Sequence, residues 1–140
     1  MNIQPLLAYY PDADVPTLRI AVQLQEDVAV IRRLFGKLAS GEIQEAELGA
    51  VIQCNLEGIR ALILCSARRR PSRALAIEYQ TSSGPVLRWS DTTCYWLEWA
   101  EKVDPVLESD SACHQYFWPG GRDEIVVELC YREYGSGGSV

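Results

Sequence analysis

The sequence predicts an α+β domain: a mostly antiparallel sheet of about six to seven strands, with two main helices packed on one of its faces. Three observations predict it. Several segments alternate apolar and polar residues, two others carry apolar residues at helical spacing, and glycine, proline or serine separates them. The 140 residues are 48% hydrophobic and 23% charged, which suits one domain with an ordinary core. We expect this domain over residues 1–134 and a flexible Gly/Ser-rich tail over residues 135–140.

The first third of the chain predicts an extended lead-in, a strand and a helix. Prolines in residues 1–16 fix φ and remove hydrogen-bond donors, so we expect turns there. Apolar and polar residues then alternate over 18–24, as in a half-buried strand. After Gln25 the apolar spacing becomes that of one helical face, and Gly41 is a suitable C-terminal stop. A short helical turn is expected over 42–48.

The middle of the chain predicts two hairpins. Glu57-Gly58 and residues 81–84 have the composition of tight turns, so we expect four consecutive strands in an antiparallel meander. The expected strands are residues 51–56, 59–66, 74–80 and 86–89.

A second helix and two final strands complete the prediction. Ser90 is an expected N-cap, with Asp91 in the first turn of a helix that runs to about Val103 and is ended or kinked by Pro105. The two strands are expected over 113–118 and 124–131.

Composition and charge disfavour several classes of protein. No apolar run approaches the ~20 residues of a membrane helix, and the first ten residues do not resemble a secretory signal peptide. The five cysteines lack the close spacing of a zinc knuckle or disulfide scaffold, so we expect free thiols in a reducing, cytoplasmic compartment. The net charge of −6 lies entirely in residues 71–140, which carry five Lys/Arg and eleven Asp/Glu. Such a charge disfavours nucleic-acid binding and favours a basic partner.

No pattern of catalytic residues is recognisable in the sequence. The single histidine, His114, follows Cys113 in an expected strand, so their side chains point to opposite faces. Cys94 or Cys130 could approach His114 only through the fold. The chain lacks the paired Cys/His spacing of zinc sites and the glycine loops that bind phosphate. We therefore expect no catalytic residue, no metal, no cofactor and no enzymatic activity.

The helix expected after Ser90 is the main candidate for binding a partner. Its apolar residues cover more of the circumference than the roughly 100° that a one-sided helix buries, so some aromatic side chains must be exposed or covered by another part of the chain. Exposed tryptophan beside carboxylates is typical of interfaces. The alternatives are a helix buried on both sides and a merely solvated acidic face. The candidate partner-binding residues are Tyr95, Trp96, Glu98, Trp99, Glu101, Asp104, Glu108 and Asp110.

A cluster of arginines lies between two expected strands. Guanidinium groups bind phosphate or carboxylate bidentately, so the cluster is a second, weaker candidate site. A solvated turn or internal ion pairs with the acidic helix are the alternatives. The candidate anion-binding residues are Arg68, Arg69, Arg70 and Arg73.

The order of elements over Ala74 to Val103 is strand, Ser-Gly turn, strand and Ser-capped aromatic helix. This order resembles a segment of bacterial toxin-immunity proteins such as the SUKH superfamily. The resemblance covers about 30 of the 140 residues. It implies a small, acidic, cytosolic α+β protein that neutralises a toxin by binding it.

These observations predict a non-enzymatic protein-binding module of immunity type, whose acidic helix covers the basic active site of a toxin. Two alternatives stay open. One is a structural subunit of a larger assembly, with exposed strands that add to a partner's sheet. The other is a small enzyme or ligand-binding protein with a pocket between sheet and helix. Its expected lining residues are Tyr79, Trp89, His114 and Tyr116.

Overall fold

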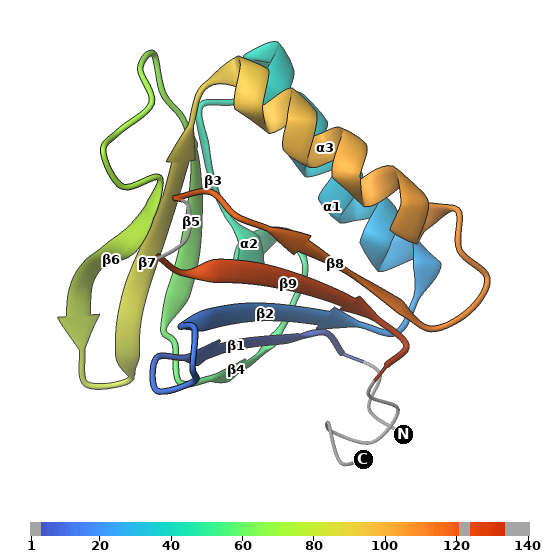
Figure 1. Cartoon of the computed structure of the whole chain (residues 1–140), viewed down its shortest axis with the longest axis horizontal. Helices are drawn as coiled ribbons and strands as arrows, with labels where there is room; N and C mark the ends of the chain where they lie inside the picture. Colours follow the sequence, from blue (N-terminus) through green and yellow to red (C-terminus); the bar gives the residue numbers. More distant parts are fainter. Residues whose placement is uncertain (1–3, 121–123, 134–140) are drawn as a thin grey trace.

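The computed structural model describes residues 4–120 and 124–133 and confirms the α+β class. Two mixed, mostly antiparallel sheets share one core with two main helices, α1 and α3, which pack together (Figure 1). The elements of the described residues are β1 (Leu6–Tyr10), β2 (Thr17–Val22), α1 (Gln25–Ser40), β3 (Glu45–Glu47), α2 (Leu48–Val51), β4 (Asn55–Glu57), β5 (Ala61–Ser66), β6 (Leu75–Thr81), β7 (Gly84–Asp91), α3 (Thr93–Leu107), β8 (Cys113–Phe117) and β9 (Val126–Tyr131).

The strands form two sheets in which neighbours along the chain are not always neighbours in space. The five-stranded sheet has the order β4-β1-β2-β9-β8, and the four-stranded sheet has the order β3-β5-β7-β6. In the first sheet β1 pairs parallel with β4, and β2 pairs parallel with β9. In the second, β5 pairs parallel with β7. The other pairings are antiparallel.

Helix α1 forms where the apolar spacing predicted it. The predicted face, Val28, Ile31, Leu34, Phe35 and Leu38, is buried. The helix ends at Gly41, whose φ of 79° is accessible to glycine at little cost and whose N–H donates to the Leu38 carbonyl. The apolar spacing and the glycine stop were therefore sufficient to predict this helix.

Helix α3 differs from the prediction at both ends. Thr92, rather than Ser90, is the N-cap: its hydroxyl accepts a hydrogen bond from the Tyr95 N–H. Asp91 is the last residue of β7 and is fully buried. The helix also continues past the expected stop, with Pro105 inside it, because its last turn buries Val106 in the core.

The predicted meander is wrong except for its second hairpin, since β5 does not pair with β6 but pairs parallel with β7. Gly58 has a φ of 70°, and a Cβ there would lie 2.7 Å from the Tyr9 carbonyl oxygen. The chain therefore passes close to β1 at this point instead of making a hairpin, and β4 pairs with β1 while β5 enters the other sheet. The second predicted hairpin is confirmed as β6 and β7, with Thr81 opposite Gly84.

Two further differences concern the lead-in and the short elements. The expected lead-in over 1–16 contains strand β1, and the expected helical turn over 42–48 contains β3 and the start of α2. The final two predicted strands are confirmed as the antiparallel pair β8 and β9. The predicted flexible tail lies outside the described residues. None of the helices in the described part of the chain is long and apolar enough to cross a membrane.

An aromatic cluster joins the helices to both sheets. Phe35 of α1, Trp89 of β7, Trp96 of α3 and Phe117 of β8 are each at most 1% exposed. The ring centroids of Trp89 and Trp96 lie 4.9 Å apart, and those of Phe35 and Trp96 lie 5.1 Å apart. The contact between the two main helices thus depends on the same rings that attach them to the sheets.

Candidate functional site

The tryptophans of α3 do not lie on its surface. Trp96 is 0% exposed and Trp99 is 7% exposed. The Trp96 indole N–H donates to the Cys65 carbonyl at 2.9 Å, and that of Trp99 donates to Asp91 Oδ2 at 3.0 Å. Tyr95 is half-buried. The prediction that these indoles anchor a partner is therefore corrected: α1, β7 and β8 cover them, which sequence spacing alone does not show.

The exposed side of α3 is a continuous stripe of other residues. Positions three, four and seven apart share a helical face, and the exposed positions of α3 follow this spacing. Leu97, on this face, is 49% exposed. We call this surface the α3 stripe; its residues are Cys94, Leu97, Glu98, Glu101, Pro105 and Glu108.

The carboxylates of the α3 stripe are free of internal ion pairs. Within residues 4–120 and 124–133, no cation lies within ion-pair distance of Glu98, Glu101, Glu108 or Asp110. Asp104 behaves differently, because its Oδ1 accepts from Arg32 Nε at 2.7 Å and joins α3 to α1. The predicted acidic residues, Asp104 excepted, are thus exposed and unpaired, as a surface that meets a basic partner requires.

A shallow hollow of about 410 Å³ lies beside Leu97, between α1 and α3. One wall comes from the C-terminal half of α1 and the other from the first turns of α3. Most of its lining residues are small. The lining residues are Arg32, Gly36, Ala39, Ser40, Thr93, Cys94 and Leu97.

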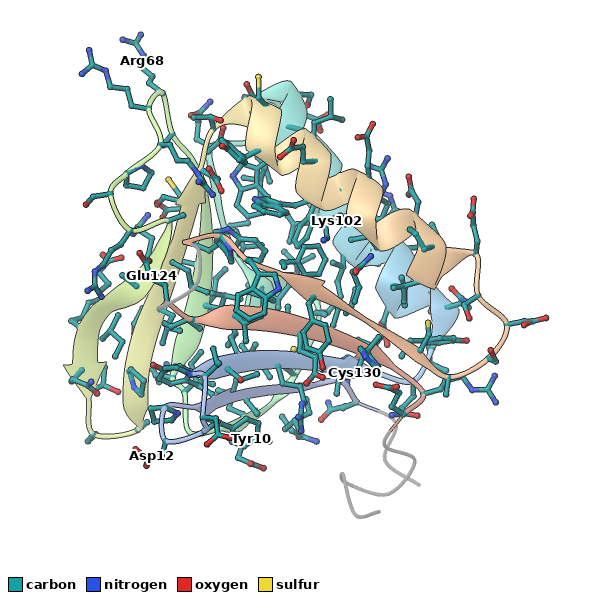
Figure 2. All side chains as sticks on the ribbon, viewed as in Figure 1. Tyr10, Asp12, Arg68, Lys102, Glu124 and Cys130 are labelled. Carbon is teal, nitrogen blue, oxygen red and sulfur yellow. The ribbon has the colours of Figure 1, made fainter. Side chains whose placement is uncertain are left out.

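The predicted arginine cluster divides into one residue that binds groups of its own chain and three that point elsewhere. Arg70 Nε donates to Asp91 Oδ1 at 2.9 Å, and its guanidinium lies 3.8 Å from the centre of the Tyr95 ring. Arg70 also donates to the Pro119 carbonyl. Arg68, Arg69 and Arg73 are exposed, and Figure 2 shows Arg68 at the tip of its loop, pointing away from the body of the domain. The four arginines therefore do not converge on one anion site.

The histidine region brings together residues that are distant in sequence. His114 of β8 lies opposite Cys130 of β9, and neighbouring partners in a sheet share a face. The His114 Nδ1 lies 2.8 Å from Glu133 Oε2. Cysteine, histidine and glutamate on one face are the groups of a thiol nucleophile with its base.

The state of Cys130 disfavours that chemistry. Cys130 is 0% exposed, and burial, followed by the nearby Glu128 carboxylate, raises the pKa of its thiol well above the ordinary value of 9.0. Because the thiolate is the nucleophile, a buried and protonated thiol is a poor one. Of the other predicted pocket residues, Tyr116 lies beside His114, with ring centroids 5.1 Å apart. Trp89 is buried in the core, and Tyr79 is 53% exposed on β6 of the other sheet, so neither lies with them.

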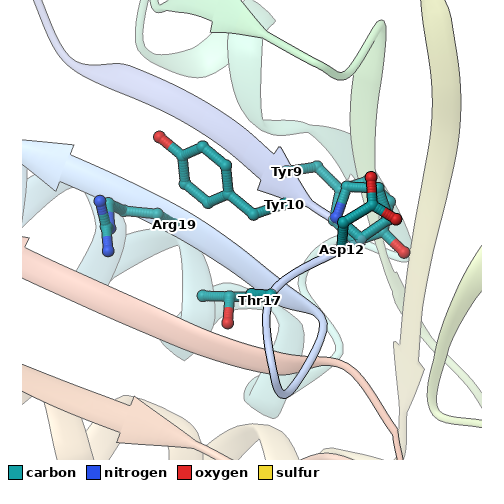
Figure 3. A pocket seen from close by; sticks show the side chains of 7 residues that line it. Tyr9, Tyr10, Asp12, Thr17 and Arg19 are labelled. Carbon is teal, nitrogen blue, oxygen red and sulfur yellow. The ribbon is translucent and has the colours of Figure 1, made fainter.

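A larger hollow, of about 570 Å³, surrounds the turn between β1 and β2 (Figure 3). Tyr10 and Arg19 lie side by side there, with the guanidinium 5.2 Å from the centre of the phenol ring. Arg19 also pairs with Glu128 at 2.7 Å. Burial, followed by the hydrogen bond with Glu57, raises the pKa of Tyr10. These groups hold four strands of the sheet together. Sequence reasoning missed them because it predicted turns around Tyr10 and did not show which strands lie beside one another.

Within the described residues, no three His, Cys, Asp or Glu side chains are placed to hold a metal ion. The chain matches no protein-family model, and no curated protein or solved structure is significantly similar to it.

Proposed function

We propose that this protein is a non-enzymatic protein-binding module whose α3 stripe docks onto a basic surface of another protein. One observation carries the proposal: Leu97, 49% exposed, is flanked by Glu98 and Glu101, which are exposed and without an ion pair in the described part of the chain. An apolar side chain surrounded by charge is the arrangement of a binding surface with a central anchor and a polar rim.

The net charge of the molecule also favours a basic partner. A net charge of −6 attracts a basic partner over a distance of about 8–10 Å and speeds its association. Unpaired carboxylates at the surface can then pair with the partner's cations without first breaking internal ion pairs. Leu97 replaces the buried tryptophans as the apolar anchor of the site.

The finer proposal is an immunity-type protein. In this mechanism the stripe covers the basic active site of a cognate toxin and prevents substrate from entering. The support is the acidic, unpaired helix face together with the resemblance over Ala74 to Val103. A protonated, buried Cys130 beside the only histidine favours occlusion over chemistry by this chain.

The proposal is tested by capture from an extract of the native host with charge-reversed baits. Glu98→Lys with Glu101→Lys changes the α3 stripe. Asp14→Lys with Glu47→Lys makes the same change in net charge at exposed positions elsewhere. We expect the wild type and the second variant to capture the same basic protein, with capture weakening as salt rises, and the first variant to lose it by tenfold or more.

Equal capture by both variants would show that the stripe is not the binding surface. The immunity-type proposal has a separate readout, which is the activity of the captured partner. A stoichiometric amount of this chain should abolish that activity, whereas a partner that stays fully active in the complex would exclude occlusion.

A further inference from the structure

Gly36 lies in the middle of α1 on the side of the hollow between α1 and α3. Glycine inside a helix costs about 0.5–1 kcal/mol relative to alanine. A Cβ at this position would meet only the end of the Arg32 side chain, at 3.4 Å, among the described residues. The fold of a single chain therefore does not require glycine here, and the open space above Gly36 is a feature of the surface.

The solvent side of α1 carries one cation that can complement the carboxylates of α3. Arg33 of α1 is exposed and has no ion pair within residues 4–120 and 124–133. The α3 stripe beside it carries Glu98 and Glu101. The layer formed by α1 and α3 thus presents one unpaired arginine next to the acidic α3 stripe.

The helices run antiparallel, which fixes the residues that lie level with one another. Gln25 at the start of α1 donates to the Ser109 carbonyl beyond the end of α3, and Arg32 pairs with Asp104. With the common rise of 1.5 Å per residue, the first contact places Arg33 level with Glu101 and Gly36 level with Glu98, and the second places them about two residues further toward the C-terminus of α3. Gly36 and Leu97 line the same hollow.

From this register we propose that a second copy of the chain packs on the solvent side of α1 and α3. A two-fold axis parallel to the helices relates the two copies. Each α3 stripe then lies on α1 of the other copy. Glu101 meets Arg33 of the second copy, and Leu97 enters the space above Gly36 of the second copy. Both contacts occur twice, as a closed two-fold interface requires. Glu26 and Glu108 meet at the rim, where solvent screens their repulsion.

The size of the surface makes this a weak, reversible dimer. Two helices of about 24 Å in length, side by side, offer roughly 500 Å² per copy, which is at the low end for specific interfaces. The inference rests on the α3 stripe of the proposed function and adds its regulation. Because the stripe is covered in the dimer, self-association and partner binding exclude each other.

Sedimentation of the purified chain, up to about 0.5 mM, tests the dimer without any partner. We expect the wild type to dimerise, and Arg33→Glu or Glu101→Arg alone to raise the dissociation constant at least about tenfold. An equimolar mixture of these two variants should dimerise again, because each copy then offers the charge that the other lacks. A wild type that stays monomeric, or a mixture that associates no better than either variant alone, would overturn the proposal.

Gly36→Leu provides a second, independent test. It fills the space for Leu97 and improves helix propensity, so the variant should be at least as stable as the wild type yet dimerise at least tenfold more weakly. Undiminished dimerisation would contradict the placement of Leu97. If the wild type does not dimerise but still captures a basic protein, the dimer is excluded and the proposed function stands. If it dimerises but captures no basic protein, the dimer stands and the proposed function is excluded.

Discussion

Asp91 shows how a single residue can mislead a local prediction. A carboxylate one position after serine is typical of a helix start, and this pattern predicts Asp91 in the first turn of α3. In the structure Asp91 is fully buried and accepts hydrogen bonds from Arg70 and from the Trp99 indole. Arg70 lies 21 residues earlier in the chain, so no local pattern reveals the pair.

Removal of Arg70 should destabilise the domain. Arg70→Ala would leave the Asp91 carboxylate buried without its cation, and we expect a loss of about 2 kcal/mol in the free energy of unfolding, less than for a fully desolvated pair because Arg70 is partly exposed. Arg69→Ala, at an exposed position of the same loop, should change it by less than about 0.5 kcal/mol. Urea unfolding measures both, and equal effects would contradict the role of the ion pair.

Elements specified by adjacent residues were predictable, and those specified by distant strands were not. The face and stop of α1 and the β6–β7 hairpin depend on local spacing and turn residues. Strand β1 in the lead-in, the parallel pairing of β2 with β9, and β4 beside β1 depend on partners far along the chain. Apolar spacing says that a segment is half-buried, but not which strand lies next to it.

In helix α3, too, the sequence did not show which residues are buried by distant parts of the chain. The buried and exposed sides of this helix can be tested separately. Trp96→Ala would open a cavity among Phe35, Trp89 and their neighbours, so we expect a loss of about 3–5 kcal/mol in the free energy of unfolding. Leu97→Ala, one residue later on the exposed side, should cost less than about 1 kcal/mol. Thermal or urea unfolding of the pair measures this contrast. A small loss for Trp96→Ala would contradict the burial of its indole.

At the scale of the molecule, the sequence predicted the chemistry of the surface better than its geometry. Exposed Glu98, Glu101 and Glu108 agree with the prediction, because charged side chains remain in water unless a partner is provided. The burial of Trp96 and Trp99 depends on how two sheets and α1 enclose α3. That enclosure is a property of the whole fold, which the helical pattern of one segment does not contain.

Wholly and partly buried thiols and phenols also act at this scale, because the pKa of each is raised in the folded chain and the ionisation of each opposes folding. Desolvation by burial is the largest cause of the raised pKa of Cys130, and it also raises the pKa values of Tyr9, Tyr10 and Tyr116. It raises the pKa of Cys54 to about 11. A group whose pKa is higher in the folded chain than in the unfolded chain stabilises the fold at any pH below its unfolded pKa. This contribution is lost as the pH rises toward its folded pKa.

The domain should therefore lose stability steeply above pH 9, the ordinary value for these thiols. Each thiol that ionises only in the unfolded chain lowers the free energy of unfolding by up to about 1.4 kcal/mol per pH unit. Thermal unfolding from pH 7 to 11, under reducing conditions, measures the slope. Cys130→Ala should flatten it, although the cavity left behind lowers stability at pH 7, and Cys94→Ala, at the surface, is the control for loss of a thiol. A slope that Cys130→Ala leaves unchanged would mean that the Cys130 thiol ionises as readily in the folded domain as in the unfolded chain, and the argument against a Cys130 nucleophile would fall with it.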